Sequence, residues 1–144
     1  MTTIGPREGH CLCGAVRFSG EAFAGHGVEI CHCRHCRRWG GGPFMSVRFA
    51  GGVKLMAGDA LVWHASSDWA ERGFCGRCGT SLFWRLKGEP SDWIVNLHAL
   101  GDDHGLTINE HIWVDQKPDF YEFADTTPRL TEAAFMARLH STGE

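Results

Sequence analysis

Apolar residues along this chain recur in short runs that alternate with polar residues, a pattern typical of β-strands. Gly51 and Gly52 separate two of these runs and predict a tight hairpin turn, because glycine adopts positive φ without strain. The pattern therefore predicts a mainly β fold. The expected strands, rich in β-branched and aromatic side chains, are Ala15–Phe18, Phe44–Phe49, Val53–Met56, Ala60–Trp63, Ser81–Trp84, Trp93–Leu97 and His111–Val114.

A helical pattern is confined to the C-terminus, over about residues 131–141. Thr131 can cap the first turn, and Phe135, Met136 and Leu139 can share one face. No internal repeat, low-complexity segment or linker interrupts the chain before this helix. We therefore expect residues 1–144 to form a single domain, with a core of about residues 6–123 and a short C-terminal helical tail.

Composition places this 144-residue chain among ordinary globular proteins, with 43% hydrophobic and 22% charged residues. A formal net charge of −3 leaves no broad basic surface, so we expect no nucleic-acid partner. The N-terminus lacks the basic start and apolar stretch of a signal peptide, and no apolar run approaches the roughly 20 residues that span a bilayer. These features predict a cytoplasmic protein with no membrane partner.

All seven cysteines fall into three close groups. An odd number cannot pair completely as disulfides within one chain, and thiols in a reducing compartment remain available as metal ligands. Four thiolates close a tetrahedral zinc site, whereas three leave a position open for water or substrate. We therefore expect two zinc ions per chain, one structural and one catalytic. The groups are the N-terminal pair (Cys11, Cys13), the central trio (Cys31, Cys33, Cys36) and the C-terminal pair (Cys75, Cys78).

Spacing alone leaves open which groups share an ion. The N-terminal and C-terminal pairs could close one site and leave the central trio open, or Cys33 and Cys36 could instead join the C-terminal pair. We favour the first arrangement because the central trio is contiguous and can converge unaided. Residues two apart on a strand share one face, so we expect Cys11 with Cys13, and Cys31 with Cys33, to approach their ions from strands.

The cysteine groups lie in segments that resemble the glutathione-dependent formaldehyde-activating enzyme family, which includes centromere protein V. The resemblance implies a Mss4-like fold of small antiparallel sheets around a structural zinc. It assigns that zinc to the N-terminal and C-terminal pairs, and a catalytic zinc to the central trio. The matching segments are Gly9–Val16, Cys31–Arg37, Gly41–Phe44, Phe74–Gly79 and Glu110–Val114, followed by Lys117 and Pro118.

The residues around the central trio are candidates for substrate binding. Arg37, flanked by Arg34 and Arg38, could bind the carboxylates of glutathione or balance the thiolate charge. Trp39 and Gly41 could line a pocket or belong to a plain loop, and Trp39 stands where many family members carry a small hydroxyl residue. We take Arg37, Trp39 and Gly41 as candidate substrate-binding residues.

The resemblance implies carbon–sulfur lyase chemistry, in which a small-molecule thiol such as glutathione and an aldehyde such as formaldehyde give S-hydroxymethylglutathione. We therefore expect a zinc-dependent enzyme that catalyses this addition or acts on a related thiol adduct. The alternative is a non-catalytic, zinc-stabilised binding module, since Mss4-like folds also serve as protein-binding scaffolds. The central trio favours the enzyme, because a scaffold needs no open metal site.

Overall fold

The computed structural model describes residues 3–23, 27–88 and 92–142. Two compact units share the chain: residues 1–27 and 46–106 belong to the first, and residues 28–45 and 107–144 to the second. The expectation of one domain over residues 1–144 stays a prediction.

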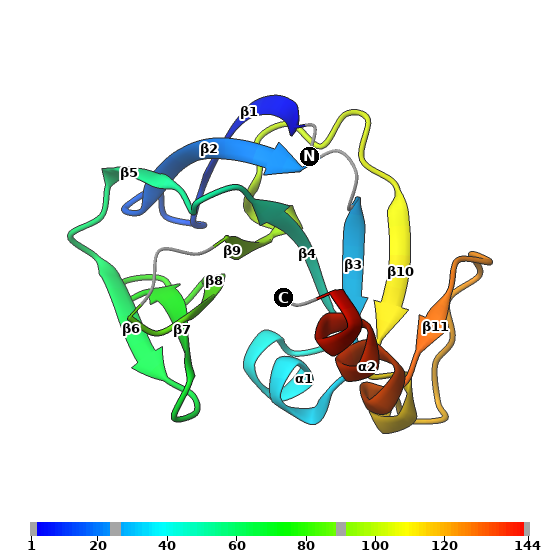
Figure 1. Ribbon diagram of the computed structural model, residues 1–144. Helices are drawn as coiled ribbons and strands as arrows, with labels where there is room; N and C mark the ends of the chain where they lie inside the picture. The colour runs from blue at the N-terminus through cyan, green and yellow to red at the C-terminus, as the bar shows by residue number, and fades with distance from the viewer. Residues whose placement is uncertain (1–2, 24–26, 89–91, 143–144) are drawn as a thin grey trace. The chain divides into compact units, whose positions relative to one another are not determined.

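The first unit is almost entirely antiparallel sheet (Figure 1). The strands β4, β9, β8, β7 and β6 are hydrogen-bonded in that order, while β2 pairs with β1 and β5 and touches β4 through one residue pair. The elements are β1 (Thr3–His10), β2 (Arg17–Phe23), β4 (Phe44–Phe49, shared with the second unit), β5 (Lys54–Ala57), β6 (Leu61–Ala65), β7 (Ala70–Cys75), β8 (Ser81–Leu86), β9 (Trp93–Asn96) and the 3-10 turn η2 (Leu97–Ala99).

The core of the first unit is centred on aromatic side chains. Phe18 from β2 meets Phe83 from β8 at 5.0 Å between ring centroids and Phe49 from β4 at 6.3 Å, in edge-to-face geometry. All three are fully buried, and each contributes roughly 1.5–3 kcal/mol of burial free energy. Gly9 lies against this cluster, since a Cβ there would come within 2.4 Å of the Phe18 ring and 2.5 Å of the Ala99 carbonyl oxygen.

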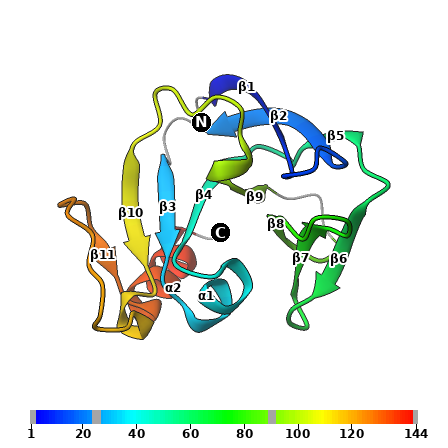
Figure 2. The same cartoon turned by 180° about the vertical axis from the view of Figure 1, so that it is seen from behind.

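The second unit combines a parallel sheet with two helices (Figure 2). Its strand β10 pairs in parallel with β3 on one side and β11 on the other. Long connections separate these strands in sequence, so no hairpin forces them antiparallel. The elements are β3 (Val28–Cys31), α1 (Arg34–Gly40), β10 (Ile108–Ile112), the 3-10 turn η3 (Val114–Gln116), β11 (Arg129–Leu130) and α2 (Glu132–Thr142).

An ion pair between a partly exposed arginine and a buried carboxylate anchors the C-terminal helix α2. Arg138 donates two hydrogen bonds, of 2.8 and 2.7 Å, to the carboxylate of Glu110 on β10, which is only 5% exposed. The Thr131 hydroxyl accepts from the Ala134 N–H at 3.1 Å, which confirms its expected role as a cap. Phe135 packs against Trp113 at 5.0 Å. No helix among the described residues has the length and apolar character needed to cross a membrane.

The mainly β prediction is confirmed, and every expected strand overlaps an observed one. Three details were wrong. Gly51 and Gly52 do have positive φ, but they join no hairpin, because β4 pairs with β9 whereas β5 pairs with β2. The strand expected at 111–114 ends at Ile112, where Trp113 turns the chain with φ 56° into a 3-10 helix. A second helix, α1, lies outside the C-terminal region.

Candidate metal centres

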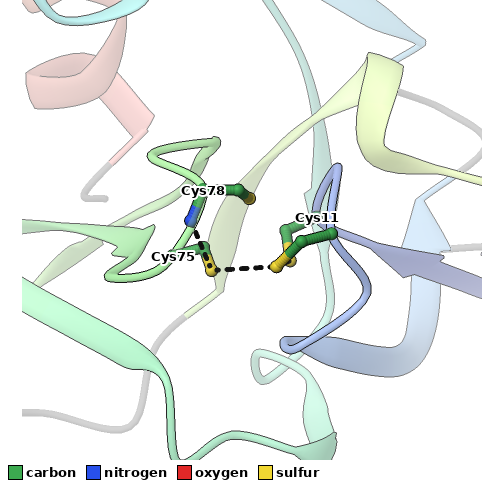
Figure 3. A group of neighbouring side chains, drawn as sticks. Cys11, Cys75 and Cys78 are labelled. Carbon is green, nitrogen blue, oxygen red and sulfur yellow. Dashed lines mark hydrogen bonds between the residues drawn. The ribbon is translucent and has the colours of Figure 1, made fainter.

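Two turns of the first unit bring four sulfurs together. Cys11 and Cys13 lie in the turn that follows β1, while Cys75 ends β7 and Cys78 lies in the turn before β8. Their sulfur atoms all lie within 4.8 Å of one another, although Cys13 and Cys75 are 62 residues apart in the chain. Figure 3 shows Cys75 and Cys78 facing Cys11 across the gap between these turns. Of the two groupings that the spacing allowed, the structure has the first.

The dimensions of this four-cysteine group fit zinc. The sulfurs of Cys11 and Cys13 are 3.7 Å apart, and those of Cys13 and Cys75 are 3.8 Å apart. Metal–sulfur bonds of about 2.3 Å in tetrahedral geometry give sulfur–sulfur edges of about 3.8 Å. Backbone N–H groups also point at the sulfurs, from Val16 to Cys11 at 3.3 Å and from Cys78 to Cys75 at 3.4 Å. Such hydrogen bonds favour the thiolate form that a metal needs.

The pKa shifts within the four-cysteine group favour binding of a cation. A backbone hydrogen bond from Ala15 lowers the pKa of the Cys13 thiol, but desolvation and the three neighbouring thiols raise this pKa to about 11. Hydrogen bonds from the hydroxyl and backbone of Thr80 lower the pKa of Cys78 to about 5. The thiols therefore oppose ionising together, and a bound cation would remove that repulsion.

The central trio is assembled by a strand-to-helix turn. Cys31 is the last residue of β3, Cys33 is the N-cap of α1, and Cys36 lies in the first turn of α1 with its side chain buried. The Cys33 sulfur accepts a hydrogen bond from the Cys36 N–H at 3.3 Å. The three sulfurs lie within 4.8 Å of one another. Neighbouring Cys33 and Cys36, together with burial, raise the pKa of Cys31 above the ordinary thiol value.

Two expectations about these cysteines were wrong in their local geometry. Cys33 caps a helix rather than continuing the strand of Cys31, and Cys11 and Cys13 lie in a turn beyond β1. Helix α1 was missed because Cys36 is its only buried residue, so its segment shows no apolar face. Gly41, a left-handed C-cap with φ 83°, and the basic residues Arg37 and Arg38 of the last turn were the local signals of its end.

The central trio contains no fourth cysteine, histidine or carboxylate ligand among the residues that the structure describes. His32 lies between two of the cysteines in sequence, yet both of its ring nitrogens are engaged elsewhere. Nδ1 lies 2.8 Å from the Tyr121 hydroxyl, and Nε2 lies 2.8 Å from Nδ1 of His111. Burial, followed by the charges of His111 and Lys117, lowers the pKa of His32 to about 4. A tetrahedral metal ion bound by these three sulfurs would therefore keep one position for a non-protein ligand.

The candidate substrate-binding residues all lie on or beside α1. Arg37 donates from Nε to the His32 carbonyl at 3.0 Å and from a terminal nitrogen to the Gln116 carbonyl at 3.0 Å. Trp39 packs against Phe44 at 5.1 Å between ring centroids. Gly41 donates its N–H to the Arg37 carbonyl at 2.9 Å. These contacts hold the helix in place, and binding of substrate by the three residues stays a prediction.

Several residues near the trio escaped sequence reasoning. The side-chain oxygen of Gln116 accepts the Arg34 N–H at 2.8 Å from 82 residues away, so nothing local in the sequence signals the contact. Tyr121 and Asp125 form hydrogen bonds with His32 and His111, respectively, from a segment without regular secondary structure. Their irregular loop carries no periodic pattern that would have pointed to them.

Comparison with known proteins places these clusters in a family context. A profile of the family described as glutathione-dependent formaldehyde-activating enzyme matches residues 6–116, a range that contains all seven cysteines. An uncharacterised lyase of Schizosaccharomyces pombe is 31% identical over 124 residues, covering 86% of this chain and 90% of the relative. A protein of Halomonas elongata, named a putative glutathione-dependent formaldehyde-activating enzyme, is 29% identical over 126 residues, covering 80% of this chain and 79% of its own.

A solved structure shows a similar fold. The crystal structure of a Rhodobacter sphaeroides protein matches with a TM-score of 0.56 at 20% identity, covering 85% of this chain and 98% of that chain. This comparison shows that the fold is shared. The family assignment rests on the profile and on the sequence relatives. The chain belongs to the glutathione-dependent formaldehyde-activating enzyme family.

Proposed function

We propose that this protein is a zinc-dependent enzyme of the carbon–sulfur lyase type. It adds a thiol such as glutathione to an aldehyde such as formaldehyde, or acts on a related thiol adduct. The observation that carries the proposal is the central trio, whose three sulfurs converge without a fourth protein ligand among the described residues. A purely structural zinc site is closed by four ligands, as the N-terminal and C-terminal pairs together provide. Family membership and the names of the two relatives support the same class of reaction.

The proposed reaction needs no oxidant or reductant. The thiol sulfur attacks the carbonyl carbon, the carbon–sulfur bond forms, and the π bond of the carbonyl breaks. The thiol loses its proton, and the former carbonyl oxygen takes one up as a hydroxyl. A zinc ion held by the trio would bind the incoming thiol and lower its pKa, which favours the nucleophilic thiolate.

The chain itself contributes a rigid arrangement of the three sulfurs. Cys31 is held by the β3–β10 pairing, opposite Ile112, while Cys33 and Cys36 are held by the cap of α1. Arg37 ties α1 to the end of β3 through the His32 carbonyl. Because these contacts exist before a substrate arrives, little reorganisation is needed on binding, as effective catalysis requires. We also propose that Trp39 and Gly41 contact the substrate, and that Arg37 binds a carboxylate through its remaining N–H donors.

Two measurements test this proposal together. The zinc-loaded protein should carry two zinc ions per chain and speed the approach to equilibrium of glutathione and formaldehyde beyond the enzyme-free rate. Cys36→Ser should remain folded with one zinc ion and lose that acceleration. A single zinc ion in the wild-type protein without acceleration would favour the binding module. Full acceleration by Cys36→Ser would refute the assignment of chemistry to the trio.

A further inference from the structure

The two peptide groups that flank Cys33 are both hydrogen-bonded to side chains. The carbonyl of His32, in the peptide group before Cys33, accepts from Nε of Arg37 at 3.0 Å. The N–H of Arg34, in the peptide group after Cys33, donates to Oε1 of Gln116 at 2.8 Å. Because a peptide group is planar, holding these two planes restricts φ and ψ of Cys33, which are −68° and 156°.

Cys33 lies between the elements that hold the other two cysteines of the trio. Cys31 ends β3, which is paired with β10, and Cys36 lies within α1. Rotation about the backbone of Cys33 would change how α1, and Cys36 with it, is oriented relative to Cys31. The convergence of the three sulfurs within 4.8 Å of one another therefore depends on this junction.

Gln116 contributes to both of the contacts that flank Cys33. Its side-chain oxygen accepts the Arg34 N–H, and its backbone carbonyl accepts from a terminal nitrogen of Arg37 at 3.0 Å. Gln116 is half-buried and ends η3, the 3-10 turn that follows β10. One residue thus holds the start of α1 through both its backbone and its side chain.

The side-chain amide of Gln116 has a defined orientation. A backbone N–H only donates, so the atom that faces Arg34 is the amide oxygen. The amide nitrogen donates to Oε1 of Glu132 at 3.4 Å. Glu132 is held in the first turn of α2, where its N–H donates to Oδ1 of Asp115 at 3.0 Å. Turning the amide over would break both of its contacts.

We infer that Gln116 is a positioning residue for the central trio, which it presets for a metal ion by fixing the backbone of Cys33. Ligands that are already in place lose little conformational freedom when a metal binds. Partners that orient metal ligands typically contribute roughly 10–100-fold to metal affinity. The importance of Gln116 for thiol–aldehyde chemistry rests on the proposed function, but its effect on metal binding does not.

Two variants separate the hydrogen bonds of Gln116 from its bulk. Gln116→Met keeps the length of the side chain but removes the oxygen that accepts from Arg34. Combining Gln116→Glu with Glu132→Gln exchanges donor and acceptor between these two side chains, so it can keep both contacts. The backbone carbonyl that accepts from Arg37 is present in both variants.

¹¹³Cd NMR of the cadmium-loaded protein reports on the two metal sites separately. The four-cysteine group and the trio should each give one signal, and Cys36→Ser should lose the signal of the trio. Gln116→Met should shift or broaden this signal and weaken cadmium binding at the trio about tenfold, measured in competition with a chelator. The double variant should restore both. The signal of the four-cysteine group, which lies in the first unit, is the internal control.

Each outcome decides between the proposals. An unchanged trio signal and affinity in Gln116→Met would overturn the inference, and so would a double variant that restores neither. Loss of both signals in Gln116→Met would also overturn it, because the residue would then support the whole fold rather than the trio. A single signal in the wild type would refute the trio as a metal site and both proposals with it. The expected cadmium results without acceleration of the thiol–aldehyde reaction by the zinc-loaded wild type would refute the proposed function alone.

Discussion

The four-cysteine group and the central trio should differ in how much their metal stabilises the fold. Cys75 and Cys13 are 62 residues apart in the chain, whereas Cys31 and Cys36, the ends of the trio, are only five residues apart. A ligand stabilises a fold only by as much as it prefers the folded over the unfolded chain. An unfolded chain can gather a local trio far more easily than two distant pairs. Cys75→Ser should therefore destabilise the zinc-loaded protein more than Cys36→Ser does.

Loop-closure entropy sets the size of this difference. Closing a loop of 62 residues costs an unfolded chain about 4 kcal/mol, and closing one of about five residues costs about 2 kcal/mol. The folded protein avoids both costs because its sulfurs are already together. The two variants should thus differ by about 2 kcal/mol, roughly 30-fold in the unfolding equilibrium constant. A loss of about 4 kcal/mol is a large share of the 5–15 kcal/mol that stabilises a typical domain, so Cys75→Ser is expected to unfold at a much lower urea concentration than the wild type.

Urea denaturation at a buffered zinc concentration measures the effect, with the fluorescence of the six tryptophans as the signal. The wild type, Cys75→Ser and Cys36→Ser should be compared with zinc and after treatment with a chelator. The urea midpoints of the three proteins should differ with zinc and agree closely without it. The reason is that only the metal-dependent part of the free energy of unfolding differs between the variants.

Two results would refute this reasoning. Equal destabilisation by the two variants in the presence of zinc would show that the distance spanned in sequence does not decide the contribution of each site. A difference in urea midpoint between the two variants that persists in metal-free protein would show that the serine itself, rather than lost metal binding, causes the effect.

Three further changes test the packing around these sites. Gly9→Ala should lower the stability by about 1–3 kcal/mol, because its Cβ would clash with the Phe18 ring and the Ala99 carbonyl. Gly42→Ala is the control: a Cβ at this position meets no atom within 4 Å, so the urea midpoint should change little. Arg138→Met should lower the free energy of unfolding by about 1–2 kcal/mol, because the buried Glu110 carboxylate loses two hydrogen bonds; the loss is limited because Arg138 itself is 43% exposed. Adding Glu110→Met should recover part of this stability, as measured by thermal unfolding. The pKa of Asp125 is lowered in the fold, so its contribution to stability is present above its unfolded pKa of about 4 and is lost as the pH falls below that value. Metal-free Asp125→Asn should show a flatter decline of the urea midpoint below about pH 4 than the wild type, and identical acid profiles would count against the Asp125 contacts.

The sequence was most informative where its signals are local. Alternating apolar runs predicted strands that all overlap observed ones, because side-chain period is set by backbone geometry alone. Close spacing of the cysteines indicated metal ligands for a similar reason, since neighbouring thiols converge with little help. The Thr131 cap could be predicted because its partner, the Ala134 N–H, lies three residues away.

Tertiary structure decided everything that depends on residues distant in the chain. Spacing allowed two groupings of the cysteines, and only the folded arrangement of the turns at Cys11 and Cys75 chose between them. Helix α1 forms without an apolar face because its cap and the Gln116 contact stabilise it from outside. The hydrogen bond between Tyr121 and His32 joins residues 89 positions apart in the chain. Hydrogen bonds depend on which groups are close in space. A local sequence pattern does not say which distant residues folding brings together.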